Sequence, residues 1–167
     1  SGFSGADLEN LLNEAAILAG RDNRPRITMS DVNEAANKVM MGPQKRSHIV
    51  TERDRKITAY HESGHAILHK LLPLTDEVHE VSIVPRGMAG GYTMSRPEND
   101  DNYATVNKLN NMICTFMGGR VAEEIIFDDI STGASNDIER ATKLARKMVT
   151  QFGMSKKLGF INLGSTS

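Results

Sequence analysis

The first part of the chain has the apolar spacing of an amphipathic helix. Leucines and alanines recur three or four positions apart, which places them on one helical face. We expect this helix to run from about Gly5 to Ala19, and Ser4 with Asp7 forms a capping-box pattern at its start. The predicted apolar face consists of Leu8, Leu11, Leu12, Ala15 and Ala19.

A second helix is predicted after a break. The polar stretch 22–25 ends in Pro25 and interrupts the helical pattern. Ser30 can cap the next helix, whose apolar face should consist of Val32, Ala35, Ala36 and Val39. Two short helices bury little apolar surface, so we expect them to be part of a larger domain. Residues 41–47 combine glycine, proline and two positive charges, which indicates a linker.

The pattern changes in the middle of the chain. A helix is expected from about Glu52 to Leu72, because Pro73 follows directly. Its apolar side should hold Ile57, Gly64, Leu68, Leu71 and Leu72. Between Glu77 and Arg96 apolar runs flank a glycine-rich segment, which predicts two strands joined by a turn.

The remaining residues return to a helical pattern. We expect helices at about 105–117 and 121–127, separated by Gly118 and Gly119, and a last helix at about 136–152. The buried stripe of that last helix should contain Ile138, Ala141, Leu144, Ala145 and Met148. The expected fold class is therefore mainly α, with one small antiparallel β hairpin.

Composition and charge exclude several classes of protein. The 167 residues are 39% hydrophobic and 25% charged, as in a folded soluble domain, and the net charge of -1 gives no broad attraction to nucleic acid. Cys114 is the only cysteine, so any metal must be held by histidines and carboxylates. No targeting or membrane segment is visible, and the first methionine is Met29, so we interpret the chain as a fragment of a longer reading frame.

The sharpest chemical signal is the pentapeptide from His61 to His65. Two histidines four apart on a helix project from one face, so both imidazoles can reach one ion. Glu62 lies beside them and can take a proton from water, which is the pattern of a zinc protease. The competing interpretation is a pair of structural core histidines.

A catalytic zinc needs a third protein ligand from another part of the chain. His69 continues the spacing, but it lies about 12 Å along the helix axis from His61, which is too far. We predict that His69 is a partly exposed helix residue. Glu123, Glu124 and Asp137 remain as candidates, and the residues alone do not choose between them.

The motifs together resemble the FtsH-type, membrane-anchored, ATP-dependent zinc metalloproteases of bacteria and organelles. The resemblance runs through nearly the whole chain and includes many small residues at fixed turns. It is carried by the segments 2–8, 13–16, 42–43, 58–62, 64–66, 85–87, 118–120, 122–124, 131–134 and 136–137.

The resemblance implies a role for each candidate. His61, His65 and Asp137 resemble the ligands of Zn2+, and Glu62 resembles the general base. Glu123 and Glu124 resemble carboxylates near the site rather than ligands. The implied division is a C-terminal part of an AAA ATPase lid subdomain at 1–46 and a zinc metalloprotease domain at 47–167.

The resemblance also implies properties of the full-length protein. Gly5 and Ala6 match a stretch near the nucleotide base in AAA modules, yet no phosphate-binding loop occurs in this chain. We therefore expect ATP and Mg2+ to bind only to the full-length protein. The resemblance implies that this protein is a homohexamer. Its implied location is the inner or plasma membrane, anchored by a segment outside this chain, with the protease domain in the cytoplasm. Its expected partners are unfolded protein substrates and no nucleic acid.

A rival hypothesis treats the chain as an ATPase-lid and oligomerisation fragment. Its helices would then only assemble a ring, and its metal would be structural. A structural zinc is closed by four protein ligands, whereas a catalytic zinc keeps one position for water. The ligand set therefore separates the two hypotheses.

Overall fold

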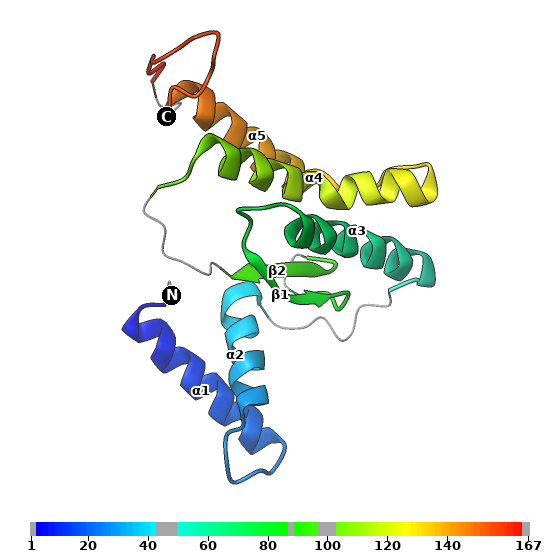
Figure 1. The fold of residues 1–167 in the computed structure, drawn as a ribbon. Coiled ribbons are helices and arrows are strands. Elements are labelled where there is room, and N and C mark those ends of the chain that lie inside the picture. Colours follow the sequence, from blue (N-terminus) through cyan, green and yellow to red (C-terminus); the bar gives the residue numbers. More distant parts are fainter. Residues whose placement is uncertain (1–2, 43–49, 87–88, 97–102, 165–167) are drawn as a thin grey trace. The chain divides into compact units, whose positions relative to one another are not determined.

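The computed structural model describes residues 3–42, 50–86, 89–96 and 103–164 (Figure 1). The chain forms two compact units, one of residues 1–49 and 84–89 and the other of residues 50–83 and 90–167. Helices dominate, and the strands form one two-stranded antiparallel sheet. The predicted fold class is confirmed.

The first unit contains helices α1 (Gly5–Arg21) and α2 (Met29–Met41). Leu11, Ala15 and Ala35 form its buried core. The capping box of Ser4 and Asp7 is present, as predicted. The predicted apolar face was too wide, because Leu8 and Leu12 are 51% and 56% exposed.

The predicted cap of α2 was wrong. Thr28 is the N-cap, and its side chain accepts a hydrogen bond from the backbone N–H of Asp31. The Asp31 carboxylate in turn accepts a hydrogen bond from the Thr28 backbone N–H at 2.7 Å and also pairs with Arg24. This reciprocal pattern starts the helix at Met29, so Ser30 lies inside its first turn. Of the predicted linker, residues 43–47 lie outside the described residues.

The second unit is built on α3 (Glu52–Leu71) and α4 (Val106–Phe127), which pack against each other. α3 ends as predicted, but Leu71 on its predicted apolar side is 72% exposed. The predicted break at Gly118 and Gly119 was wrong, since both glycines are buried within the continuous helix α4. A Cβ on Gly64 would lie 2.3 Å from the Gly118 carbonyl oxygen, so the glycines allow close helix packing rather than a turn.

The predicted hairpin is confirmed as strands β1 (Glu77–Ser82) and β2 (Tyr92–Arg96). The strands are antiparallel, with Val81 opposite Thr93 and an irregularity between Val78 and Glu80. Both strands contact α3. Residues 87–88 of the predicted turn lie outside the described residues.

The last helix, α5 (Ser135–Thr150), follows the short 3-10 helix η1 (Thr132–Ala134) and packs against α4. Its predicted stripe is only partly right. Ala141 and Met148 are buried, whereas Ile138 is 43% exposed and Ala145 is exposed as well. Asp137 lies in the first turn of α5 and is half-buried in the second unit.

Candidate active site

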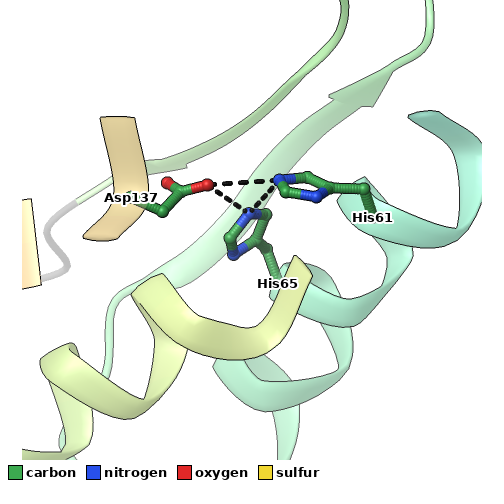
Figure 2. Close-up of side chains that lie close together, drawn as sticks. All are labelled: His61, His65 and Asp137. Atoms are coloured by element: carbon green, nitrogen blue, oxygen red, sulfur yellow. Dashed lines mark hydrogen bonds and ion pairs between the residues drawn. The ribbon is translucent and has the colours of Figure 1, made fainter. Parts of the chain in front are cut away.

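His61, His65 and Asp137 converge on one point (Figure 2). The two histidines lie one turn apart on α3, and both are buried. Their Nε2 atoms are 3.0 Å apart. Asp137 Oδ2, from the first turn of α5, lies 3.2 Å from Nε2 of His61 and 3.3 Å from Nε2 of His65. Two segments far apart in sequence thus supply three donor atoms.

The opposite nitrogen of each imidazole is held by an acceptor. Nδ1 of His61 lies 2.7 Å from Oε1 of Glu123. Nδ1 of His65 lies 2.6 Å from the carbonyl oxygen of Thr115. A carbonyl or carboxylate oxygen can only accept, so these partners assign a proton to each Nδ1. In the neutral imidazoles, both Nε2 lone pairs then face each other and the Asp137 carboxylate.

This donor set fits a divalent metal ion. Two lone pairs and a carboxylate repel one another unless a cation lies between them. Zinc binds these ligand types at about 2.0–2.1 Å, so neighbouring donors in a tetrahedral site lie about 3.3 Å apart. The observed separations of 3.0, 3.2 and 3.3 Å agree with that geometry. Among the described residues, this is the group of three metal-capable side chains that comes together.

Glu123 and Glu124 have different surroundings on α4. Glu123 is 2% exposed, and its second oxygen accepts a hydrogen bond from the Ser131 backbone N–H at 2.7 Å. It therefore connects His61 to the segment that precedes η1. Glu124 points elsewhere and forms an exposed ion pair with Arg120 at 3.1 Å. Of the two, Glu123 is the one that can orient the His61 imidazole.

Local structure places Asp137 at the site. The Ser131 side chain accepts a hydrogen bond from the Gly133 backbone N–H and starts η1, which leads directly into α5. Asp137 then lies in the first turn of α5, where a negative charge is favoured. Burial raises the pKa of Asp137, but the contacts that His61 and His65 make with it when they are protonated outweigh burial and hold this pKa below its ordinary value. The carboxylate is therefore ionised at neutral pH.

Glu62 lies beside the convergence point and is 8% exposed. Burial raises its pKa above the ordinary value for a glutamate, against the opposing effects of Thr93 and the two histidines. A carboxylate with a raised pKa is a better proton acceptor. The position and the environment of Glu62 both suit acid–base chemistry.

The other predicted residues lie away from this point. His69 is half-buried in the last turn of α3, where its Nδ1 lies 2.9 Å from the Asp76 carbonyl oxygen. Gly5 and Ala6 form the exposed first turn of α1, and their role near a nucleotide stays a prediction.

Two residues that support the site, Thr93 and Thr115, were not predicted from the sequence. Thr93 donates a hydrogen bond to Glu62, and Thr115 supplies a backbone oxygen to His65. Neither residue belongs to a spacing pattern with the histidine motif. Only the tertiary packing of β2 and α4 against α3 brings them there.

Comparison with known proteins identifies the class to which this fold and site belong. Residues 48–167 match the family described as Peptidase family M41, and the chain belongs to that family. Residues 1–34 match the AAA+ lid domain.

Named relatives agree with both matches. The chain is 56% identical over 165 residues to the ATP-dependent zinc metalloprotease FtsH of Caldicellulosiruptor bescii, covering 99% of this chain and 27% of the relative. It is 59% identical over 163 residues to the ATP-dependent zinc metalloprotease FtsH of Veillonella parvula, covering 98% of this chain and 25% of the relative. The chain thus spans about a quarter of the length of these relatives. None of the helices that the structure describes has the length and apolar character needed to cross a membrane.

Proposed function

We propose that this chain carries the peptide-hydrolysing centre of an ATP-dependent zinc metalloendopeptidase. In this proposal His61, His65 and Asp137 bind the zinc, and Glu62 is the general base. The observation that carries it is the convergence of three donor atoms while both Nδ1 atoms are engaged by acceptors. Membership of a peptidase family supports the same chemistry.

The residues divide the work of hydrolysis between them. When bound, zinc polarises the scissile carbonyl and lowers the pKa of a water molecule to about 7. Glu62 accepts the proton of the attacking water and returns it to the leaving nitrogen. Glu123 and Thr115 hold the two imidazoles so that each Nε2 faces the ion. No covalent intermediate with a side chain is required.

The three-donor set argues against the rival lid and oligomerisation hypothesis. A structural zinc is closed by four protein ligands, whereas a catalytic site keeps a position for water. Within the described residues, three side chains form the group, and the proton acceptor Glu62 stands next to them. Both features favour a hydrolytic centre.

For the whole protein, we propose that residues 1–46 end an AAA lid subdomain and that residues 47–167 belong to the peptidase domain. The matches to 1–34 and 48–167 support this division. An ATPase module that binds ATP and Mg2+ would deliver unfolded or membrane-extracted chains to the peptidase centre. The full-length protein would form a homohexamer. It would be anchored in the inner or plasma membrane by a segment outside this chain, with the peptidase domain in the cytoplasm. The ATP dependence named for the relatives supports the ATPase part.

The hairpin suggests how an unfolded substrate could be held. In a sheet of two strands, each strand has one edge that its partner does not cover. An extended peptide can pair with such an edge through backbone hydrogen bonds, which gives binding with low sequence selectivity. We propose β1 or β2 as this edge.

The test uses the natural protein that contains this chain. Its hydrolysis of a disordered casein-like substrate should stop with a zinc chelator and return when zinc is added back. A stably folded substrate should be cleaved only with ATP, because a folded chain otherwise exposes peptide bonds only in rare open states. Full hydrolysis by metal-free protein would overturn the proposal.

A further inference from the structure

Thr93 makes a bond to the proposed general base that the histidine motif does not explain. Its hydroxyl donates a hydrogen bond to Oε2 of Glu62 at 2.8 Å. The same hydroxyl lies 3.0 Å from the backbone oxygen of Glu62. A single β2 side chain therefore reaches both the main chain and the carboxylate of one α3 residue.

Two contacts to one residue restrict the shape of its side chain. A glutamate has three rotatable side-chain bonds, and each additional rotamer spreads the carboxylate over more positions. A hydroxyl fixed near the Glu62 backbone and bonded to Oε2 selects the rotamers that bring the carboxylate towards β2. The bond occupies one oxygen, and a carboxylate has a second oxygen that can take a proton.

The start of β2 is built for a close approach to α3. A Cβ on Gly91 would lie 2.4 Å from Cγ2 of Thr58 and 3.4 Å from Cγ of Glu62. Only a glycine leaves room for the backbone there. The next residue, Tyr92, is tied to β1 by a 2.6 Å bond from its hydroxyl to Glu80. The two residues that precede Thr93 thus fix the strand against α3 and β1.

We propose that Thr93 is a positioning residue, which holds the Glu62 carboxylate in the orientation needed to receive a proton. This inference rests on the proposed function and adds a residue to it. Thr93 acts through Glu62, since its hydroxyl contacts Glu62 and not the proposed zinc ligands. The simpler alternative is that the hydroxyl only ties β2 to α3 and contributes stability.

The test compares Thr93→Val with Thr75→Val in the zinc-loaded natural protein. Thr75 is the matched control, because its hydroxyl also donates a hydrogen bond to a backbone oxygen of α3, that of His69 in the last turn of the helix. We expect Thr93→Val to lower kcat by about 10- to 100-fold, with KM and zinc content unchanged, because a small misplacement of a catalytic group has an effect of that size. Thr75→Val should leave kcat within about 3-fold of the parent, since losing a bond distant from the reaction changes stability only.

A second pair of variants isolates the hydroxyl and guards against a folding defect. Thr93→Ser should keep most of the activity, whereas Thr93→Ala should lose it as Thr93→Val does. A crystal structure of zinc-loaded Thr93→Ala should show Glu62 in more than one rotamer. The inference is overturned if kcat is unchanged, if zinc is lost together with activity, or if Glu62 keeps a single rotamer. Any of these results leaves the proposed function standing, because that function depends on the chelator test and on Glu62 itself.

Discussion

The backbone of Gly119 lies directly against the imidazole of His61. A Cβ on Gly119 would stand 2.4 Å from Nε2 of His61 and 2.5 Å from two of its ring carbons. Nε2 of His61, the atom nearest to this Cβ, is the one that faces Asp137 and His65. Position 119 is therefore restricted to glycine by the His61 imidazole and not by helix geometry, since it lies inside α4.

We predict that Gly119→Ala displaces the His61 ring and weakens zinc binding. Overpacking of a tight interior also costs about 1–3 kcal/mol of stability. Zinc affinity and the thermal unfolding midpoint measure the two effects. The control is Gly20→Ala in α1, where a Cβ meets nothing within 4 Å. Unchanged zinc affinity in Gly119→Ala would contradict this account of the glycine.

The two adjacent glutamates of α4 provide a second test. We predict that Glu123→Gln weakens zinc binding about 10- to 100-fold. A carboxylate that accepts a hydrogen bond from Nδ1 of a ligand histidine orients the ring and makes its Nε2 a stronger metal ligand. Glu124→Gln should have little effect, since its carboxylate is exposed and pairs with Arg120. Zinc titration of both variants measures this difference. A larger loss in Glu124→Gln would reverse the assignment.

Local patterns predicted much of this structure, and tertiary contacts explain the rest. The motif from His61 to His65 was predictable because its geometry is set within one helix. Gly118 and Gly119 were misread as a break, because a glycine that permits helix packing has the same letter as one that ends a helix. The residue pattern alone left the third ligand open between Glu123, Glu124 and Asp137, and only the family resemblance pointed to Asp137.

The prediction of Ser30 as the cap of α2 was wrong for a local reason. Both are good N-cap residues, and they lie two positions apart. The structure selects Thr28 because its partner three residues later is Asp31, which also binds Arg24. Asp31 lies three residues after Thr28, as Asp7 lies three residues after Ser4, so this cap is a local signal that the sequence contains. Thr93 and Thr115 are different, since their roles exist only after β2 and α4 pack on α3.

Removing the Asp137 carboxylate should have a stronger effect than removing Glu123. We predict that Asp137→Ala lowers zinc affinity by more than about 100-fold, beyond the loss typical of a residue that only supports a ligand. The control is Glu139→Ala, two residues further on, whose carboxylate is exposed and pairs with Lys143. Zinc content after dialysis, measured side by side, checks the difference. Equal zinc content in Asp137→Ala and the parent would show that another residue is the third ligand.

Zinc affinity should depend on pH in a direction set by His61. Burial lowers the pKa of this imidazole, but the neighbouring Asp137 and Glu123 outweigh burial and raise it above 6.5. A protonated imidazole cannot bind a metal through the same nitrogen, so protons compete with zinc up to a higher pH than for an ordinary histidine. Affinity should therefore fall as the pH drops through the raised pKa, and Glu123→Gln should move this fall to lower pH. Zinc titrations at several pH values test it, and a pH-independent affinity would contradict it.

The central claim is that Glu62 is the proton acceptor of a zinc peptidase centre, and Glu62→Gln tests it most directly. The amide keeps the shape of the side chain but cannot accept the proton. Zinc content and proteolysis of a disordered substrate are measured on the same preparation of the natural protein. We predict a full zinc complement with a loss of hydrolysis of at least about 100-fold. Near-normal hydrolysis by the zinc-loaded variant would contradict the account.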